Sequence, residues 1–536
     1  MTEAASGSPP LATAAAGARR GAGAAAVVAL GILLSRLTGL VRQSVFAHYL
    51  GNSATAGAFT AALRIPNFLQ NLFGEGALSA SFIPVYAGLL ARDDRGEASR
   101  VAGAVGALLA LVVSGLVLGG VAATPLLVDV LAPGFEGGTR ALTVRLVRVL
   151  FPGIGLLVLS AWCLGILNSH RRFFLSYAAP VLWNAAMIGT LLYFGGRTGE
   201  SALAMKLAWG AVVGSALQLL VQLPMVLRLA GPLRPALRAA GPHVRTVVRN
   251  FVPAFVSRGI VQISAFVDSI IGSLISAAAV AALGYAQAVY TLPVSLFGMS
   301  VSAAELPAMS SVVGSSDEVA AHLRRRLDAG LQRIAFFVVP SAVAFAALGD
   351  LIAAALFQTG RFGRADAVWV WGILAGSAVG LLAATMGRLY SSTYYALRDT
   401  RTPLRYALVR VALGTVAGYL LAVPAPRALG LGPAWGAAGL TLASGTVAWL
   451  EYALLRRTLN ARIGRTGLRP SYAARVWGAG ALAAAAAWAA RLSLPPLHPK
   501  LGAVVVLATF AAAYGLVALA LRVPEARALA RRVLRR

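Results

Sequence analysis

The sequence predicts an all-α polytopic membrane protein with about 14 transmembrane helices. We expect two parallel six-helix lobes around a central cavity, plus two extra C-terminal helices. Composition is the first indication: hydrophobic residues make up 58% of the 536-residue chain and charged residues 12%, and the mean hydropathy is +0.76. This composition lies far from that of soluble proteins and excludes a soluble globular fold. Loop charges and an internal repeat are the other two indications.

The transmembrane helices are predicted from apolar runs of about 20 residues, the length that crosses a bilayer. Residues 1–23, rich in Ala, Gly, Ser and Pro, are expected to form a disordered cytoplasmic tail, and residues 523–536 a basic cytoplasmic tail. The helices are predicted near residues 24–49, 54–90, 97–128, 140–168, 172–195, 201–229, 245–276, 279–312, 319–349, 366–397, 403–424, 433–459, 470–492 and 500–522.

Arginines determine the predicted orientation. The net charge is +29, and lysine occurs only at Lys206 and Lys500. Most arginines fall in every second loop, and such loops are typically cytoplasmic, so both termini are predicted to be cytoplasmic. In a soluble protein this charge would indicate a nucleic-acid partner. Here it indicates orientation among membrane lipids, and no nucleic-acid partner is expected.

A set of residues recurs at a nearly constant offset that spans six helices. The repeat divides the chain into an N-lobe at 24–230 and a C-lobe at 243–461, with 470–522 as two added helices. Transporters are often built from such repeats around a central substrate site; a repeated scaffold without transport is the alternative. The matching positions are Ser35-Arg36 with Ser257-Arg258, Pro66 with Pro293, Phe73-Gly74 with Phe297-Gly298, Ser79-Ala80 with Ser302-Ala303, and Pro84 with Pro307.

Ionisable residues interrupt the apolar segment 35–86. Such groups at membrane depth usually face a bundle interior or a water-filled cavity, although arginines near helix ends also extend to the headgroups. An excess of guanidinium groups suits an anionic ligand, because they bind phosphate through paired hydrogen bonds and stay charged. The residues concerned are Arg36, Arg42, Arg64 and Glu75, with Arg258, Arg388, Arg410, Asp268 and Glu305 further along; Glu75 and Glu305 are each expected to pair with an arginine.

Prolines fall at matching positions in the two lobes, and the Gly74-Glu75-Gly76 step adds a weak point. A proline inside a helix frees a carbonyl and bends the axis, which suits a gate or a cavity wall. The alternative is that proline is simply common in membrane helices. The predicted hinge residues are Pro66, Gly74, Gly76, Pro84, Pro293 and Pro307.

Asp268, within the predicted helix 245–276, is the best candidate for an ion-coupling or proton site, with a structural ion pair as the equal alternative. No hydrolytic or nucleotide-binding motif occurs, so neither an enzyme nor an ATP-driven pump is expected. The single cysteine, Cys163, and five scattered histidines offer no metal-ligand spacing. We expect no bound cofactor or metal, and sodium or the membrane potential as driving force.

Short motifs extend over almost all the predicted helices. They are Ser35-Arg36, Gly39 with Arg42, Arg64-Ile65-Pro66-Asn67, Phe73-x-Glu75-Gly76, Ser79, Phe82-x-Pro84, Ala132-Pro133-Gly134-Phe135, Ile166-Leu167-Asn168, Gln222-Leu223-Pro224, Leu356-Phe357-Gln358-x-Gly360, Tyr394-Tyr395-Ala396 and Asp399-Thr400-x-Thr402-Pro403. Together they resemble the MurJ (MviN) family, bacterial lipid II flippases of the multidrug/oligosaccharidyl-lipid/polysaccharide exporter superfamily.

The resemblance implies alternating access that moves lipid II, the undecaprenyl-diphosphate-linked disaccharide-pentapeptide, outward across the bacterial cytoplasmic (inner) membrane. It implies that the diphosphate and sugars lie in the cationic cavity and the lipid tail in a groove of the last two helices. Arg36 and Arg42 match arginines that are essential in the family. The expected substrate-binding residues are Arg36, Arg42, Arg64, Asn67, Glu75 and Arg258.

Three sites depart from the family pattern. The family usually has an acidic residue at Gly57, an arginine at Gln70 and an Asp-Arg pair at Gln287-Ala288, and Arg258 is a candidate to restore part of the positive field. Some members bind sodium between helices 7 and 11; Asp268 fits the first, but residues 403–424 contain no Asn, Asp or Glu. The alternatives are an exporter of another undecaprenyl-linked glycan or a different substrate, such as a drug cation, which the arginines disfavour, and a transport-inactive scaffold acting with cell-wall synthesis proteins.

Overall fold

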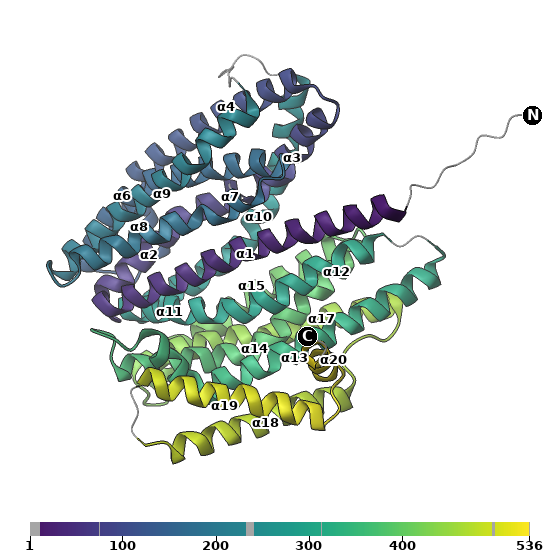
Figure 1. Cartoon of the computed structure of the whole chain (residues 1–536). Coiled ribbons are helices and arrows are strands. Elements are labelled where there is room, and N and C mark those ends of the chain that lie inside the picture. The colour runs from purple at the N-terminus through teal and green to yellow at the C-terminus, as the bar shows by residue number, and fades with distance from the viewer. Residues whose placement is uncertain (1–10, 74, 232–240, 312–313, 496–498, 535–536) are drawn as a thin grey trace, which may run out of the picture. The chain divides into compact units, whose positions relative to one another are not determined.

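The computed structural model describes residues 11–73, 75–231, 241–311, 314–495 and 499–534, and every regular element among them is a helix (Figure 1). The predicted all-α class is confirmed. The first helices are α1 (Leu11–Leu50), α2 (Ala54–Phe73), α3 (Glu75–Ala91), α4 (Arg95–Ala122), α5 (Thr124–Leu131), α6 (Gly137–Ser169), α7 (Phe173–Ala178), α8 (Pro180–Phe194) and α9 (Glu200–Ala230). They are followed by α10 (Pro242–Ile275), α11 (Ala277–Pro293), η1 (Val294–Met299), α12 (Ser300–Ser310), α13 (Ser316–Phe357), α14 (Arg364–Ala396), α15 (Arg401–Ala422), α16 (Pro424–Ala428), η2 (Pro433–Trp435), α17 (Gly436–Ile463), α18 (Pro470–Ser493), α19 (Pro499–Ala520) and α20 (Pro524–Leu534).

Within the described ranges, 10 helical stretches are long and apolar enough to cross a bilayer, which confirms a polytopic membrane protein. The other predicted helices overlap α1, α2 with α3, α10 and α18, so the total of about 14 crossings remains a prediction. The qualifying stretches are Arg95–Ala122, Gly137–Ser169, Phe173–Phe194, Glu200–Ala230, Ala277–Ser310, Ser316–Phe357, Arg364–Ala396, Arg401–Ala428, Pro433–Ile463 and Lys500–Ala520.

Some boundaries differ from the prediction. α1 begins at Leu11, inside the predicted tail, because alanine, the strongest helix former, is abundant there. The helix predicted at 54–90 contains α2 and α3, which flank residue 74, a residue outside the described ranges. The helix predicted at 279–312 contains α11, the π-helix η1 and α12. Pro293 lacks the N–H that would continue a regular helix, which explains the change of helix type beside it.

The chain packs as two compact units with borders inside α1, α2, α5, α6 and α10 rather than between the predicted lobes. The lobes 24–230 and 243–461 therefore do not coincide with these units, and the lobe arrangement remains a prediction. Unit 1 comprises Met1–Phe46, Ala62–Val128 and Ala141–Gln262; unit 2 comprises Ala47–Ala61, Asp129–Arg140 and Ile263–Arg536.

Unit 1 is held together by α3, α4, α6, α9 and the first part of α10. Tyr86 and Trp162 belong to its large cluster of buried side chains. Polar groups join α6 to α9: buried Ser160 donates a hydrogen bond to Gln222 (2.9 Å) and accepts one from Gln218 (3.1 Å). Because lipid tails are as apolar as leucine, close packing and such internal hydrogen bonds stabilise helix contacts in a bilayer.

In unit 2, α14 and α17 approach closely at glycines. Gly372, Gly376 and Gly380 recur every four residues on α14, the small-residue pattern of membrane helix pairs. A side chain at Gly376 would lie 2.6 Å from the Ala438 carbonyl oxygen, and one at Gly380 would collide with Gly445 of α17. The absence of side chains therefore permits the backbone contact.

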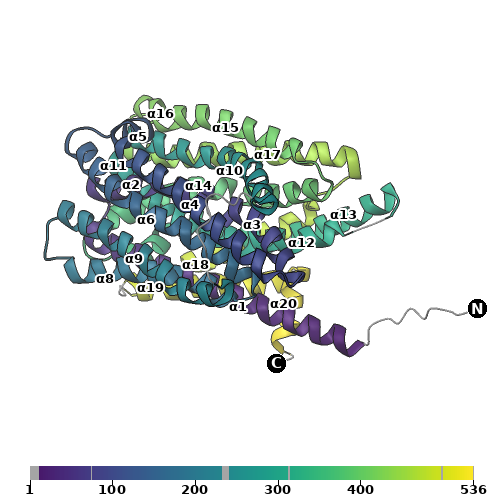
Figure 2. The same cartoon turned by 90° about the horizontal axis from the view of Figure 1, so that it is seen from above.

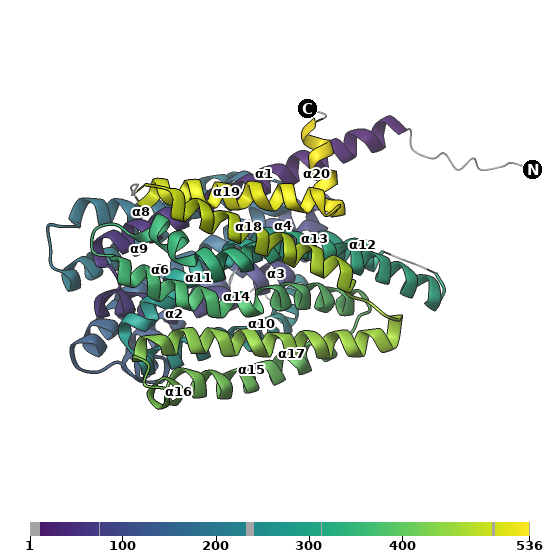
Figure 3. The same cartoon turned by 90° about the horizontal axis from the view of Figure 1, so that it is seen from below.

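The C-terminal helices belong to unit 2. α18 and α19 pack on each other and on α13 (Figure 3), and α15 lies along α17 (Figure 2). Arg491 of α18 pairs with Asp350 of α13 at 2.8 Å. The Tyr472 hydroxyl donates to the Glu525 carboxylate at 2.8 Å, so α20 is fastened to α18.

We expect Gly380→Val to lower the free energy of unfolding by about 1–3 kcal/mol, because the new side chain overlaps the α17 backbone. The matched control is Gly414→Val on α15, where an added Cβ meets no heavy atom within 4 Å. Chemical unfolding in detergent micelles measures both. Equal effects of the two substitutions would contradict close glycine packing as the basis of the α14–α17 contact.

Candidate functional site

Arg42 of α1 lies against α8 inside unit 1. Its guanidinium carbon is 5.1 Å from the centre of the Trp183 ring, within cation–π range, and its Nη1 is 3.8 Å from the Met187 sulfur. Arg42 Nε is buried without a hydrogen-bond partner among the described atoms. α8 itself has no charged residue. A buried guanidinium N–H without an acceptor favours an anion, because the loss of its contact with water is otherwise uncompensated.

A polar contact joins α1 to α8 one turn before Arg42. Asn184 of α8 is buried, and its Nδ2 lies 3.4 Å from Thr38 Oγ1, one turn before Arg42. The five residues Thr38, Arg42, Trp183, Asn184 and Met187 define what we call the Arg42 cluster. Sequence reasoning missed its α8 members. The signal was Asn184, because an amide inside an apolar span needs a partner just as a charge does.

The other predicted binding residues do not all belong to the Arg42 cluster. Arg36 is exposed; it lies six positions before Arg42, which places the two on different faces of α1. Arg64 and Asn67 are half-buried on one face of α2, three residues apart. The side chains of Glu75 and Arg258 lie outside the described part of the structure, so their contribution remains a prediction.

The predicted hinge residues have different surroundings. Pro66 is buried inside α2 and Pro84 is exposed inside α3. Pro293 ends α11 and leads into the π-helix η1, a rare element frequent at functional sites; Pro307 is exposed within α12. The interruption predicted near Pro293 is therefore confirmed. Gly74 lies outside the described residues and Gly76 is in α3, and a hinge role for any of the six remains a prediction.

Carboxylates of unit 2 pair with several arginines. Buried Glu305 of α12 accepts a hydrogen bond from Arg333 at 3.1 Å and lies 3.5 Å from Arg326, which confirms the predicted pairing of Glu305. Arg410 of α15 donates to Glu451 of α17 at 3.0 Å. Arg410 is a sequence candidate for a cationic cavity, but its charge is balanced within unit 2.

Asp268 is half-buried on α10, and α15 packs beside this helix: a Cβ added at Gly418 would lie 3.5 Å from the Ile271 side chain. α15 carries no Asn, Asp or Glu, and it brings the guanidinium of Arg410 instead. A cation between these helices would need oxygen ligands from both. The residues present do not fit a sodium site of that kind, and we derive no step through sodium.

The structure shows the surroundings of the three sites at which this chain has neutral residues in place of the family's charged ones. A side chain at Gly57 would collide with the Ala277 carbonyl, so the family's acidic residue has no room here. Gln287 is exposed and donates to Thr291 on its own helix at 2.9 Å. Ala288 and Gln70 are half-buried. Gly57 is therefore a close-packing position, which sequence reasoning registered only as a missing charge.

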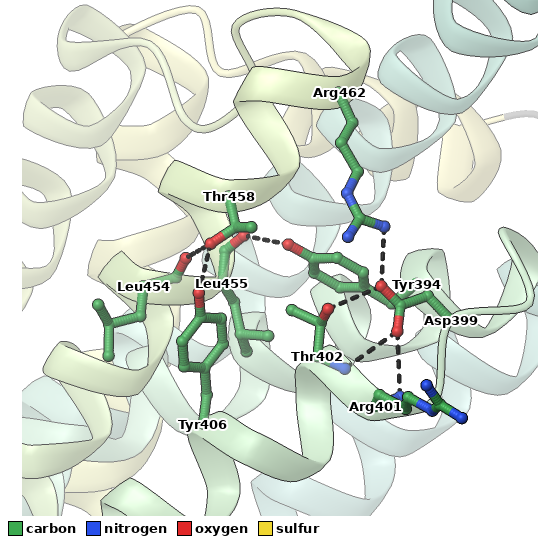
Figure 4. A network of polar contacts seen from close by, with 9 residues as sticks. All are labelled: Tyr394, Asp399, Arg401, Thr402, Tyr406, Leu454, Leu455, Thr458 and Arg462. Atoms are coloured by element: carbon green, nitrogen blue, oxygen red, sulfur yellow. Dashed lines mark hydrogen bonds and ion pairs between the residues drawn. The ribbon is translucent and has the colours of Figure 1, made fainter.

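The Asp399-Thr400-x-Thr402-Pro403 motif closes the turn between α14 and α15 (Figure 4). The Asp399 carboxylate accepts from the backbone N–H and hydroxyl of Thr402 (3.0 and 2.7 Å) and from Arg462 of α17 (2.8 Å). These bonds, the Thr402 N–H first, lower the pKa of Asp399 to about 2. Tyr394 donates to the Leu455 carbonyl at 3.0 Å. The motif thus joins three helices and is accounted for by structure.

The sequence matches the protein-family model described as Lipid II flippase MurJ over residues 46–514. A lipid II flippase MurJ from Burkholderia cenocepacia is 31% identical over 434 residues, covering 79% of this chain and 80% of the relative. A probable lipid II flippase MurJ from Rhizobium tropici is 32% identical over 435 residues, covering 80% and 79%.

Two solved structures share the fold. A lipid II flippase MurJ in the inward closed conformation superposes with a TM-score of 0.74 at 21% identity, covering 92% of this chain and 98% of that one. An inward-facing MATE family transporter of the MOP superfamily gives 0.65 at 17% identity, covering 80% and 95%. At these identities the likeness concerns the fold.

A double-mutant cycle tests the contact between Arg42 and Trp183 in the Arg42 cluster. We expect Arg42→Leu and Trp183→Leu to show a coupling free energy of about 0.5–2 kcal/mol in chemical unfolding, because each removes one side of a desolvated cation–π contact. The matched control pairs Arg42→Leu with Trp209→Leu, an exposed tryptophan on α9, and should show no coupling. Coupling that is the same in both cycles would contradict the contact.

Proposed function

Because this chain belongs to the MurJ family of lipid II flippases, we propose that it carries lipid II from the inner to the outer leaflet of the bacterial cytoplasmic membrane. The family match over residues 46–514 carries the proposal. The chain is accordingly a transporter and not an enzyme. The similar fold of a MurJ structure supports alternating access as the way in which it works.

Arg42 is the residue best suited to meet the diphosphate of lipid II. The Nε of its guanidinium is buried without a hydrogen-bond partner among the described atoms, and α8 supplies no competing carboxylate. A phosphate would satisfy the unpaired Nε–H through a charge-assisted hydrogen bond. Arg36, which is exposed, would attract the same group from water. Neither arginine can lose its charge by deprotonation, so both hold an anion at any physiological pH.

The lipid tail suits the surface of α18 and α19. Their exposed side chains include Leu482, Leu492, Leu501, Val504 and Leu516. We take the membrane potential rather than sodium as the driving force. Each negative charge that leaves a negative cell interior releases about 2.3 kcal/mol at 100 mV, and the α15 residues near Asp268 do not fit sodium.

Complementation of a bacterium depleted of its own lipid II flippase tests the proposal. We expect the wild-type chain to rescue growth, Arg42→Ala and Arg36→Ala to lose rescue, and Arg427→Ala to retain it. Arg427 is an exposed arginine of the short helix α16 and is the matched control. Normal membrane insertion of every variant is confirmed by immunoblotting. Absence of rescue by the inserted wild-type chain would favour another undecaprenyl-linked substrate or a scaffold in cell-wall assembly.

We also propose that both termini are cytoplasmic, and cysteine labelling tests this. Cys163 is the only cysteine and is fully buried, so the parent chain gives an unlabelled background. A membrane-impermeant maleimide should label Glu136→Cys in intact spheroplasts and Arg92→Cys only after lysis. Both positions are exposed and lie in loops predicted on opposite sides. The reversed pattern would show the opposite orientation.

A further inference from the structure

Four residues other than glycine adopt a left-handed backbone conformation in the described part of the chain. Three of them are arginines with φ near 60°, a region that costs energy for any residue with a Cβ and in which glycine is the usual choice. The residues are Asp93 (φ 55°), Arg171 (59°), Arg398 (60°) and Arg522 (58°).

All four occupy the same position of the same turn, two residues after the last residue of a helix. The Arg171 N–H donates to the Asn168 carbonyl (3.0 Å), and the next N–H, of Arg172, reaches back to Leu167 (2.8 Å). Arg398 and Arg522 make the equivalent bonds to Tyr395 and Leu519, both at 3.0 Å. This is the helix-ending turn in which glycine is preferred because it relieves the strain.

The strained residues lie on one predicted side of the membrane. Asp93, Arg171, Arg398 and Arg522 all fall in loops that the arginine distribution makes cytoplasmic. In the described loops of the opposite side, each residue with positive φ is a glycine: Gly51, Gly137, Gly196, Gly360 and Gly430. On the predicted outer side, glycine occupies every described position with positive φ. On the predicted cytoplasmic side, four turns have a strained residue with a side chain, and other turns have glycine. This difference indicates that the arginine side chains have a purpose there.

The three arginines are available for binding. Each is exposed, and none has an ion-pair partner among the side chains that the structure describes. Asp93, by contrast, pairs with Arg95 at 3.1 Å. Each arginine follows the end of a helix that is long and apolar enough to cross a membrane, and a guanidinium at such a position suits phosphate. The partner common to three separate loops on one side of a membrane protein is the bilayer surface itself.

We propose that Arg171, Arg398 and Arg522 bind the phosphates of anionic phospholipids in the cytoplasmic leaflet. The cytoplasmic leaflet carries a negative surface potential that attracts basic residues close to it. The site rests on the orientation proposed above, but not on transport. Backbone strain at each turn lowers the stability of the folded chain, and the stabilisation by bound phospholipid depends on the lipid composition.

The full-length chain in phosphatidylcholine nanodiscs, with and without an equal part of phosphatidylglycerol, provides the test. We expect the triple variant Arg171→Gly, Arg398→Gly and Arg522→Gly to melt about 1–3 °C higher in phosphatidylcholine, because glycine relieves the strain. It should also lose at least half of the rise in melting temperature that phosphatidylglycerol gives the wild type. The control is Asp93→Gly, at the same position of the same kind of turn, which removes no arginine and should retain the full rise.

Three results would overturn the proposal. An unchanged phosphatidylglycerol effect in the triple variant would show that these arginines do not bind the lipid. A lower melting temperature in phosphatidylcholine would show that they act on the helix C-termini through the dipole instead. Loss of stabilisation by added lipid II, but not by phosphatidylglycerol, would assign the arginines to the substrate. Because melting is measured, a chain that fails complementation still gives a decisive answer.

Discussion

A bilayer offers no water to an unpaired peptide group, and every other feature of this chain depends on that constraint. It requires helices throughout, and it makes each charge within them costly unless something compensates it. The chain uses several kinds of compensation: Glu451 balances Arg410, Arg326 and Arg333 surround Glu305, and aromatic and sulfur groups surround Arg42. Of these arginines, Arg42 is the one with no carboxylate within ion-pair distance among the described residues, and such a guanidinium suits an anionic substrate.

The fold was largely predictable, because apolar runs and loop arginines follow directly from the bilayer's thickness and field. The sequence did not predict where a helix changes its hydrogen-bonding type, or which part of a helix packs with which unit. The π-helix after Pro293 depends on local hydrogen bonding, and the assignment of residues 47–61 to unit 2 depends on packing with distant residues. Neither leaves a periodic signal, so neither is readable from hydropathy.

Only the α1 residues of the candidate site were predictable from the sequence. Arg42 stands out as a charge in an apolar run, whereas Trp183 and Met187 resemble any residues of an apolar helix and are identified only by contact. The same limitation applies to motifs. Asp399 and Thr402 look like candidates for function, yet they close a turn and join α14, α15 and α17. Sequence identifies unusual residue types well, and it does not identify the ordinary residues that surround them.

The contact between Gly57 and Ala277 constrains how this sequence can evolve. A single mutation that introduced the family's acidic residue at position 57 would push its side chain into the carbonyl of residue 277 and separate two segments of unit 2. The backbone near 277 would have to move first, and that change alone loses close packing without adding a charge. Position 57 is therefore coupled to position 277, and a residue larger than glycine at 57 requires an accompanying change at the backbone it meets.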